Sequence, residues 1–228
     1  PRYRLVVAAN RDEYHDRPAA PLARWPAPAD ILAGRDLRAG GTWLGLDSRR
    51  RFGVVTNFRD LTPAPAGARS RGGLIPGYLG NPAPADDYLA ALEAEAGGYG
   101  GFNLLLADGE SLWYASNRGT PFAQPLSPGV HGLSNERLDT PWPKLLRVRR
   151  GFEHWLRDGG KMEDGTLFAL LADRVPAADG RLSGNGPLPG AGIDQEWERA
   201  LSAPFVLHDG YGTRCSTLLW LPKQGEPR

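Results

Sequence analysis

Cysteine is almost absent from this sequence of 228 residues, because Cys215 is the only one. An internal disulfide is therefore excluded, and a zinc site is not indicated, since such sites usually combine cysteines and histidines at short spacing. The four histidines, His15, His131, His154 and His208, lie far apart in the chain. We expect no metal or other cofactor, and the lack of paired cysteines favours a reducing compartment, hence a cytoplasmic location.

Long apolar runs and an excess of one charge are also missing. No stretch of about 18 apolar residues occurs, so we expect no transmembrane segment. The 27 basic and 26 acidic residues give a net charge of +1, which offers no global attraction for nucleic acid. We therefore expect a small-molecule substrate or ligand as the partner and no nucleic acid, while no pattern in the sequence indicates an oligomeric state.

Glycine and proline are abundant, with 30 and 21 residues, and they divide the chain into short segments. The apolar patterns predict strands at 5–9, 42–46, 52–58, 102–107, 112–116, 129–133 and 212–221, and helices at 74–79, 86–96, 141–157 and from 164 to near 176. Loops are expected at 16–30, 61–73 and 179–192. Because strands and helices are grouped rather than alternating, we expect an α+β fold in one domain spanning residues 1–228.

Polar residues lie at one end of four of these strands. Charged groups are costly to bury unless paired, and a strand end can hold them rigidly beside a cleft. Asparagine amides can donate to a developing oxyanion, and an arginine with an aspartate can hold a nucleophile or a carboxylate. Taken singly, each is alternatively a solvent-exposed turn residue. The residues concerned are Asn10, Arg11, Asp12 and Glu13 after the first strand, Asn57 in the third, Asn135 after residues 129–133, and Arg214 in the last.

Four other residues are open to alternative interpretations. Trp43 ends a glycine-rich run that precedes a strand, which indicates a core position or the wall of a pocket. Cys215 is either a nucleophile or a small buried hydrophobe, the usual state of a free cysteine. His15 is either a base beside the charged run or a loop residue. Pro1 could act as a terminal amine base, but its neighbours in sequence do not support that role.

Several sequence blocks, taken together, resemble the NRDE proteins of the Transport and Golgi organisation family. The first is the run from Leu5 to Glu13, and the others follow in the family's order across nearly the whole chain. They are LAGRD at 32–36, GGTWLG at 40–45, TNFR at 56–59, SRG at 70–72, LSNE at 133–136 and YGTR at 211–214. This family is in turn similar to the N-terminal-nucleophile hydrolases of the bile salt hydrolase and penicillin V acylase group.

The resemblance implies a four-layer αββα sandwich and an N-terminal cysteine that attacks an amide carbonyl, with its own α-amino group as base. The only methionine is Met162, and the chain begins with Pro1, so we expect the nucleophile upstream of Pro1. The resemblance carries over four catalytic positions, and the other polar residues of the first run, with Trp43, are expected to bind substrate. The catalytic positions are Asp12, Asn57, Asn135 and Arg214, and the substrate-binding ones are Asn10, Arg11, Glu13 and Trp43. Ala9 stands where the hydrolase pattern has arginine.

Three functions remain open at this stage. The first is a hydrolase of an amide or acyl bond in a small molecule. The second is a non-catalytic protein on the same fold that handles lipid, acyl-CoA or haem; haem would need an axial ligand, for which His15, His131, His208 and Cys215 are the candidates. The third is a folded domain without chemistry, which Ala9 favours.

Overall fold

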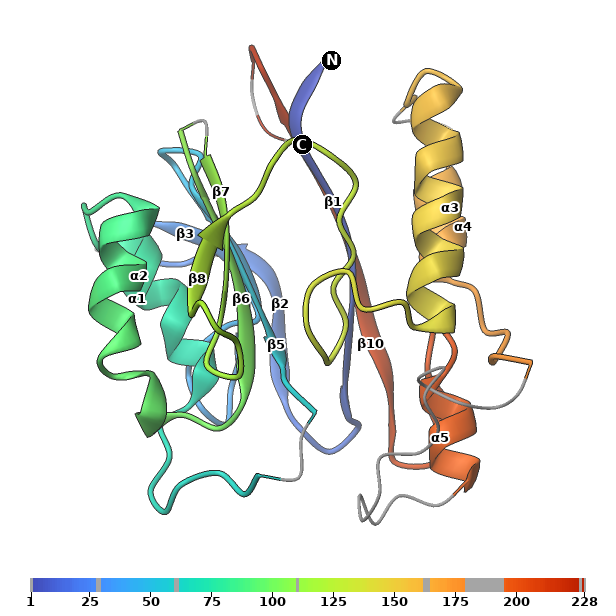
Figure 1. Ribbon diagram of the computed structural model, residues 1–228, viewed down its shortest axis with the longest axis horizontal. Coiled ribbons are helices and arrows are strands. Elements are labelled where there is room, and N and C mark those ends of the chain that lie inside the picture. The colour runs from blue at the N-terminus through green and yellow to red at the C-terminus, as the bar shows by residue number, and fades with distance from the viewer. Residues whose placement is uncertain are drawn as a thin grey trace. The chain divides into compact units, whose positions relative to one another are not determined.

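The computed structural model describes residues 2–27, 30–59, 62–109, 111–161, 165–178, 195–225 and 227. Their contacts divide the chain into two compact units (Figure 1). The terminal unit comprises Pro1–Asp16, Gly129–Leu133 and Leu138–Arg228, and the central unit comprises Arg17–Pro128 and Ser134–Arg137. Both ends of the chain thus contribute to one unit, and the middle of the chain forms the other.

A seven-stranded antiparallel sheet forms the centre of the central unit. Its strands pair in chain order, and they are β2 (Ala19–Arg24), β3 (Ile31–Asp36), β4 (Leu44–Asp47), β5 (Phe52–Asn57), β6 (Phe102–Asp108), β7 (Ser111–Ser116) and β8 (Ala123–Pro125). Strands β4 and β5 pair as the sequence predicts, with Leu44 opposite Val54. Strands β6 and β7 also pair, with Leu105 opposite Tyr114.

Two helices of the central unit lie on one face of this sheet (Figure 1). Helix α1 (Leu74–Gly80) packs on β4 and β5, and α2 (Ala85–Glu93) packs on β6, β7 and β8. Short 3-10 turns, η1 (Arg71–Gly73) and η2 (Ala96–Gly98), adjoin them. Fully buried side chains from both layers, including Tyr78, Leu89 and Phe102, form one apolar core. Burial of this apolar surface is the main force that holds the helices on the sheet.

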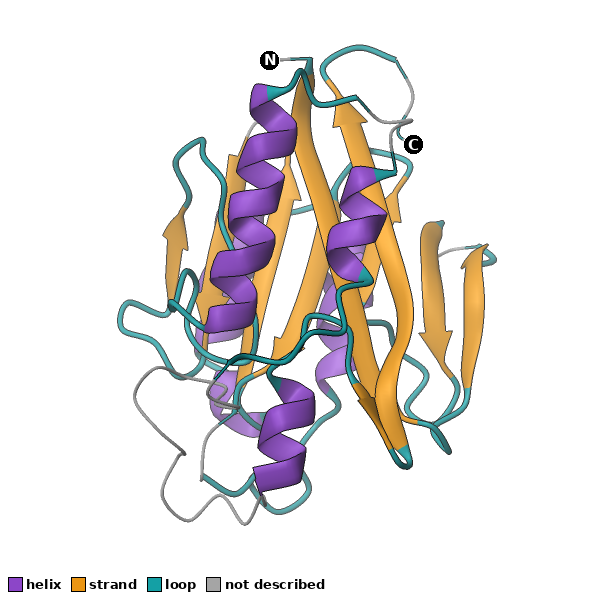
Figure 2. Ribbon diagram, turned by 90° about the vertical axis from the view of Figure 1, so that its right-hand side faces the viewer, coloured by secondary structure: helices purple, strands orange, loops and turns teal. Residues whose placement is uncertain are grey.

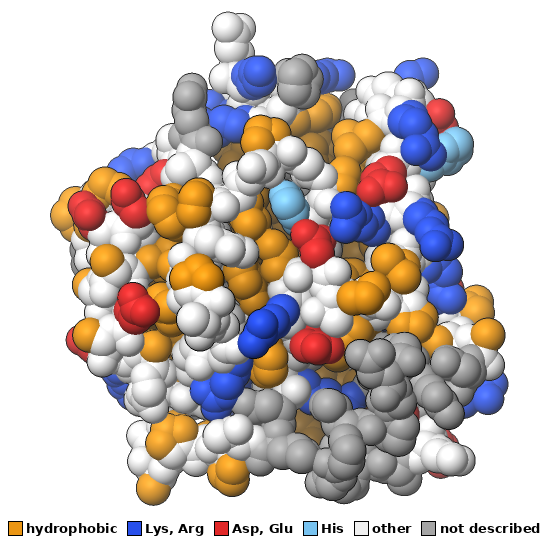
Figure 3. Space-filling model, viewed as in Figure 1, with side chains coloured by type: hydrophobic (Ala, Val, Ile, Leu, Met, Phe, Trp, Pro, Cys, Tyr) orange, Lys and Arg blue, Asp and Glu red, His pale blue; other side chains and the backbone are white. Residues whose placement is uncertain are grey.

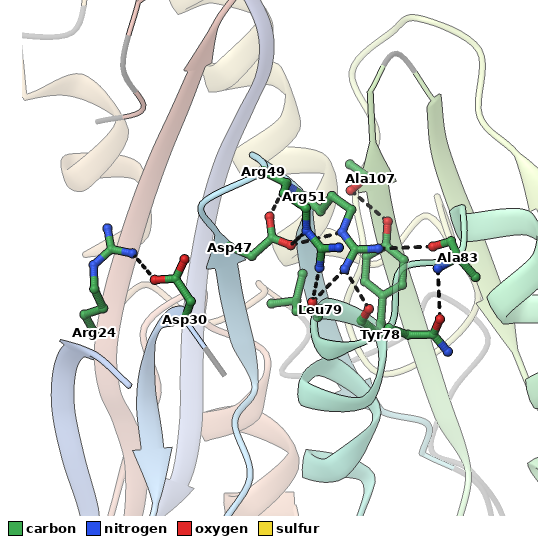
Figure 4. A network of polar contacts seen from close by, with 10 residues as sticks. Arg24, Asp30, Asp47, Arg49, Arg51, Tyr78, Leu79, Ala83 and Ala107 are labelled. Atoms are coloured by element: carbon green, nitrogen blue, oxygen red, sulfur yellow. Dashed lines mark hydrogen bonds and ion pairs between the residues drawn. The ribbon is translucent and has the colours of Figure 1, made fainter. Parts of the chain in front are cut away.

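A buried ion pair lies at the C-terminal end of α1 (Figure 4). The Arg51 guanidinium lies 3.0 Å from the Asp47 carboxylate, and both side chains are less than a tenth exposed. The same guanidinium donates to the carbonyls of Tyr78, Leu79 and Ala83, at and just beyond the last turn of the helix. Because the carbonyls of a last helical turn lack partners within the helix, a cation at this point both satisfies them and complements the helix dipole.

The terminal unit is built on a three-stranded sheet in the order β1-β10-β9. Its strands are β1 (Tyr3–Tyr14), β9 (Leu207–His208) and β10 (Tyr211–Pro222), and its helices are α3 (Pro143–Arg157), α4 (Thr166–Leu171) and α5 (Gln195–Leu201). Helices α3 and α4 pack together, and α4 packs on β1 and β10 (Figures 1 and 2). Trp155, Leu167 and Trp220 form the buried centre of this packing. The expected apolar face of α3 thus contributes Trp155, whereas Leu156 is 43% exposed.

The first strand differs most from the sequence-based expectation. We expected a strand ending at Ala9, but β1 continues to Tyr14, so the polar run from Asn10 to Glu13 lies inside the strand. Each residue of that run has a partner on β10, from Ser216 to Gly212. The backbone of the run is therefore part of the sheet ladder. The pairing strand is some 200 residues distant in sequence, which is why a local reading ended the strand too early.

Both edge strands of the large sheet were missed. β2 lies within the expected loop 16–30, and its register shifts between Ala20 and Ala23, around Pro21. β8 also contains a proline, Pro125. Proline removes a ladder hydrogen bond and is tolerated mainly at sheet edges, so these strands carry a loop-like composition. The expected strand at 129–133 is wrong, because those residues have no regular structure.

The helix boundaries also need correction. Helix α3 begins at Pro143 with Trp142 as its cap and no side-chain cap, although Asp139 and Thr140 were expected there. Asp139 instead adopts a positive φ of 59° and bonds backward to Gly132. Helix α5 was not expected from the sequence. The expected cap Asp164 and the whole of the expected loop 179–192 lie outside the described residues.

The fold class is thus mixed α and β, with a large antiparallel sheet and five α-helices in the described ranges. The expected order of strands, helices, strands, helices and a final strand is confirmed. No helix among the described residues is long and apolar enough to cross a membrane. Figure 3 shows acidic and basic side chains interspersed on the face it draws, in keeping with the balanced composition.

Candidate functional site

The site residues of the terminal unit are organised by a β-bulge. Arg11 pairs with Cys215 and Asp12 pairs with Thr213, so Arg214 is an extra residue on β10 without a partner on β1. A bulge of this kind bends its strand and changes where side chains point, and bulges are frequent beside functional sites. Here it places the Thr213 hydroxyl on the Asp12 carboxylate, where Thr213 Oγ1 donates to Asp12 Oδ1 over 2.5 Å.

Asp12 is a carboxyl group held in a poorly solvated position. Burial raises its pKa above the ordinary 3.8, and the Thr213 hydrogen bond and the positive charges of Lys144 and Arg11 oppose that rise only in part. Lys144 belongs to α3 and donates to the carbonyl of Leu201 at the end of α5. Burial also raises the pKa of the nearby Tyr211 phenol, with the charge of Asp12 adding to the rise. Perturbed groups of this kind are frequent at functional sites, although structural networks produce them too.

Asn10 joins β1 to the elements packed above it. Its amide nitrogen donates to the carbonyls of Leu171, at the end of α4, and Pro204. Its amide oxygen accepts a hydrogen bond from Ser216 Oγ over 2.7 Å. Both amide hydrogens and the oxygen are therefore used within the protein, and contact of Asn10 with a substrate stays a prediction.

The remaining charged residues of the run also make internal contacts. Arg11 and Glu13 form an ion pair of 3.6 Å along β1. Arg214 Nη1 donates to the carbonyls of Tyr14 and His15, over 3.0 and 2.8 Å. The bulged arginine thus fixes the end of β1 and the first residue beyond it. Substrate contact by Arg11 and Glu13 and a catalytic role for Arg214 stay predictions.

The alternative residues lie in ordinary structural settings. Cys215 is half-buried within β10, opposite Arg11. His131 Nδ1 lies 2.9 Å from Asp139 Oδ2, and the ring of His208 stacks on Trp197 at 4.2 Å between centroids. In the described part of the chain no cluster of three or more histidine, cysteine or acidic side chains could hold a metal ion.

The central unit brings Asn57 and Asn135 together. Asn135 Nδ2 donates to the Asn57 carbonyl over 3.1 Å, although the two residues are 78 positions apart in sequence. Arg59, just past the end of β5, returns a hydrogen bond from its backbone nitrogen to the Asn135 carbonyl. Asn57 itself is exposed at the end of β5, so its side-chain amide faces solvent. Two asparagines at the end of one strand provide amide donors of the kind that stabilise an oxyanion.

Three residues behind this pair were missed by the sequence analysis. They are Thr56, Asn103 and Tyr114, which are hydrogen-bonded to one another inside the large sheet. Asn103 is fully buried. The available signal was a lone asparagine in the apolar strand 102–107, since a buried amide must find partners.

Trp43 is part of a tightly packed loop region in the central unit. Its ring lies on Gly34, where an added Cβ would come within 2.5 Å of the indole. Gly41 touches the backbone of Gly72 so closely that a Cβ there would overlap it, and Thr42 donates to the Gly72 carbonyl. The sequence blocks at 32–36, 40–45 and 70–72 thus meet here for reasons of packing. A substrate contact by Trp43 stays a prediction.

The comparisons with known proteins cover the whole chain. The family model described as Transport and Golgi organisation 2 matches residues 1–228. The Transport and Golgi organization 2 homolog of Mus musculus is 33% identical over 238 residues, which cover 98% of this chain and 84% of the mouse protein. The Homo sapiens homolog is 34% identical, with the same coverage, and the Drosophila melanogaster protein is 27% identical over 74% of this chain and 65% of its own length. The chain therefore belongs to the Transport and Golgi organisation 2 family.

Proposed function

We propose that this domain is a hydrolase of an amide or acyl bond in a small molecule, of the N-terminal-nucleophile type. The observation that carries the proposal is the pairing of Asn57 and Asn135 at the end of β5. The fold proposed for it is the four-layer αββα sandwich in one domain. What supports that fold is that each unit has a sheet with helices packed on it.

The nucleophile in this proposal is a cysteine upstream of Pro1 in the full-length protein, as the resemblance implies. Its α-amino group takes the thiol proton, because an α-amine titrates near neutral pH. The sulfur then bonds to the carbonyl carbon, and the carbonyl oxygen becomes an oxyanion. Collapse of this intermediate breaks the bond to the leaving amine or alcohol, which takes the proton. Water then cleaves the acyl–sulfur bond and regenerates the thiol.

The asparagines act in this scheme as donors to the oxyanion. An amide group has two N–H donors, and Asn135 uses one of them on the Asn57 carbonyl, so one remains. The exposed Asn57 amide supplies a further donor. Asp12 orients the thiol and amine through its carboxylate, and Arg214 supports the end of the strand that carries Asp12. Arg11, Glu13 and Trp43 contact the substrate, and Asn10 holds β1 in place.

The test uses the full-length protein and a panel of β-lactam, β-lactone and thioester probes. Mass spectrometry first establishes whether the mature protein begins with a free cysteine. The wild type should be labelled at that cysteine, and its replacement by alanine should abolish labelling. Asn57→Ala should slow labelling by about 100-fold, the usual cost of one oxyanion donor. The control is Cys215→Ser, which should be labelled like the wild type.

Two results would contradict the proposal: a mature protein without a terminal cysteine, or no labelling by any probe. In that case, saturable binding of haem or acyl-CoA, measured by titration, would support the non-catalytic alternative.

The proposal also includes a small molecule rather than nucleic acid as the partner. It places the protein in the cytoplasm, where an unpaired thiol is ordinary.

A further inference from the structure

Behind the Asn57–Asn135 pair, three polar side chains form a connected group inside the large sheet. We call Thr56, Asn103 and Tyr114 the Asn103 network. Thr56 and Asn103 are directly opposite one another on β5 and β6, and Tyr114 lies on the next strand, β7. Asn103 is fully buried and Tyr114 is 7% exposed. A sheet interior is normally apolar, because each buried polar group costs free energy unless its hydrogen bonds are made.

Three hydrogen bonds involve the Asn103 amide, and they use both its nitrogen and its oxygen. Its oxygen accepts from the Tyr114 hydroxyl over 2.8 Å, and its nitrogen lies 3.3 Å from Thr56 Oγ1 and 2.9 Å from the Glu136 carbonyl oxygen. The Glu136 carbonyl fixes which end of the amide is the donor, since a carbonyl oxygen can only accept, and the Tyr114 hydroxyl then donates to the amide oxygen. The nitrogen is thereby pointed at Thr56 and Glu136.

The Asn103 network donates hydrogen bonds to the backbone on both sides of Asn135. Thr56 Oγ1 donates to the Ser134 carbonyl over 2.9 Å, and Asn103 Nδ2 donates to the Glu136 carbonyl. Residues 134–137 have no regular secondary structure that would set their conformation. The two carbonyls that flank Asn135 are thus held by side chains from the sheet. This arrangement orients the peptide planes around Asn135 and, through them, its side chain.

We propose that Asn103, Thr56 and Tyr114 are positioning residues that hold the Asn135 amide against Asn57 in the orientation needed to receive an oxyanion. The inference rests on the function proposed above. It extends the site from Asn57 and Asn135 to side chains that lie behind them, of which Asn103 and Tyr114 are buried. A hydrogen-bond donor stabilises an oxyanion most when it is already oriented before the reaction begins, because no free energy is then spent on turning it. This explains why a polar group is buried at this position.

The central variant is Tyr114→Phe, which removes one hydroxyl and leaves the buried Asn103 oxygen without the hydrogen bond that helps to hold the amide in place. Its matched control is Tyr78→Phe, because the Tyr78 hydroxyl is also buried in the central unit but donates to the Ala107 carbonyl, away from residues 134–137. Thr56→Val removes the donor to Ser134, and Thr56→Ser restores a hydroxyl. Hydrogen exchange of the amides of residues 134–137 in the full-length protein reports the loop conformation directly.

We expect exchange at residues 134–137 to quicken at least tenfold in Tyr114→Phe and Thr56→Val, and to stay at the wild-type rate in Tyr78→Phe and Thr56→Ser. In Tyr114→Phe and Thr56→Val, the maximal rate at which a probe labels the terminal cysteine should fall about tenfold. The probe concentration that gives half of the maximal rate should be unchanged. Equal exchange in Tyr114→Phe and Tyr78→Phe would overturn the inference. Faster exchange in a protein that no probe labels would support the positioning role and remove the hydrolase proposal.

Discussion

At Asp12 the protein places a carboxylate where water solvates it poorly. One hydroxyl and the charges of Lys144 and Arg11 compensate in part, but burial dominates and its pKa is raised. A folded-state pKa above the unfolded value means that the folded protein binds the proton more tightly. Stability contributed by this group is then present at low pH and is lost as the pH rises from about 4 through the folded-state pKa. A loss of stability at neutral pH from an ionised, buried group is typical of residues kept for function.

Asp12→Asn should therefore stabilise the fold at neutral pH while abolishing the proposed activity. The asparagine oxygen can still accept from Thr213, and the neutral side chain avoids the desolvation cost. Thermal melts between pH 4 and 8 should show the advantage of Asn over Asp increasing as the pH rises. Melting temperatures that favour the wild type more strongly at higher pH would show that the charged carboxylate is stabilising. Thr213→Val is the control, which removes the hydroxyl and should destabilise at neutral pH.

Among the elements, α1 depends on a residue that lies outside it in sequence. The Arg51 guanidinium, from the turn before β5, satisfies carbonyls at the end of the helix and pairs with Asp47. A seven-residue helix is too short to be stable on its own, so its apolar packing and this cationic cap together determine that it forms.

Arg51→Met should destabilise the protein by about 3–5 kcal/mol, because it leaves the Asp47 carboxylate buried without its main partner. Urea unfolding followed by fluorescence measures the loss. The neighbouring Arg49 also pairs with Asp47 but is half exposed, so Arg49→Met should cost about 1 kcal/mol or less. Adding Asp47→Asn to Arg51→Met should recover part of the stability. Equal losses for the two arginines would refute the assignment.

The sequence predicts those elements whose side chains form apolar runs, and it misses those at the edges of the sheet. The pairs β4–β5 and β6–β7 and the strand β10 have dense apolar runs, and all are present. The edge strands β2 and β8 carry prolines; β2 lies in an expected loop, and no element was expected at β8. Asn57 ends β5 as the sequence predicts, but Asn135 follows no strand, because residues 129–133 are irregular. Asn103 was missed because its partner Glu136 is 33 residues away, a distance that local patterns do not bridge.

On the scale of the whole molecule, the two units differ in how the chain builds them. The sheet and the apolar core of the central unit come entirely from residues 19–125. The terminal unit depends on β1 and β10, whose residues Asn10 and Ser216 are 206 positions apart. Contacts between such distant residues form late, because closing a long loop costs entropy before it gains contacts.

A fragment spanning residues 17–137 should therefore fold alone. It contains all seven strands of the large sheet, both helices that pack on it and the loop 134–137. We expect a cooperative thermal transition by circular dichroism and dispersed amide resonances by NMR. A fragment lacking residues 211–222 of the full chain should lose the terminal unit, since β1 then has no partner. A gradual melt of the 17–137 fragment would contradict its independence.

In the terminal unit, the extra residue of the β-bulge is also the arginine that holds the end of β1. If β10 were one residue shorter there, Cys215 would stay opposite Arg11 and Thr213 opposite Asp12, but the ladder would be regular and the bend of the bulge would be lost. Asp12 would keep Thr213 as its neighbour, whereas the carbonyls of Tyr14 and His15 would lose the guanidinium that holds them. When relatives are aligned or variants designed, a single-residue gap at this position is therefore a change of electrostatics, not of length alone.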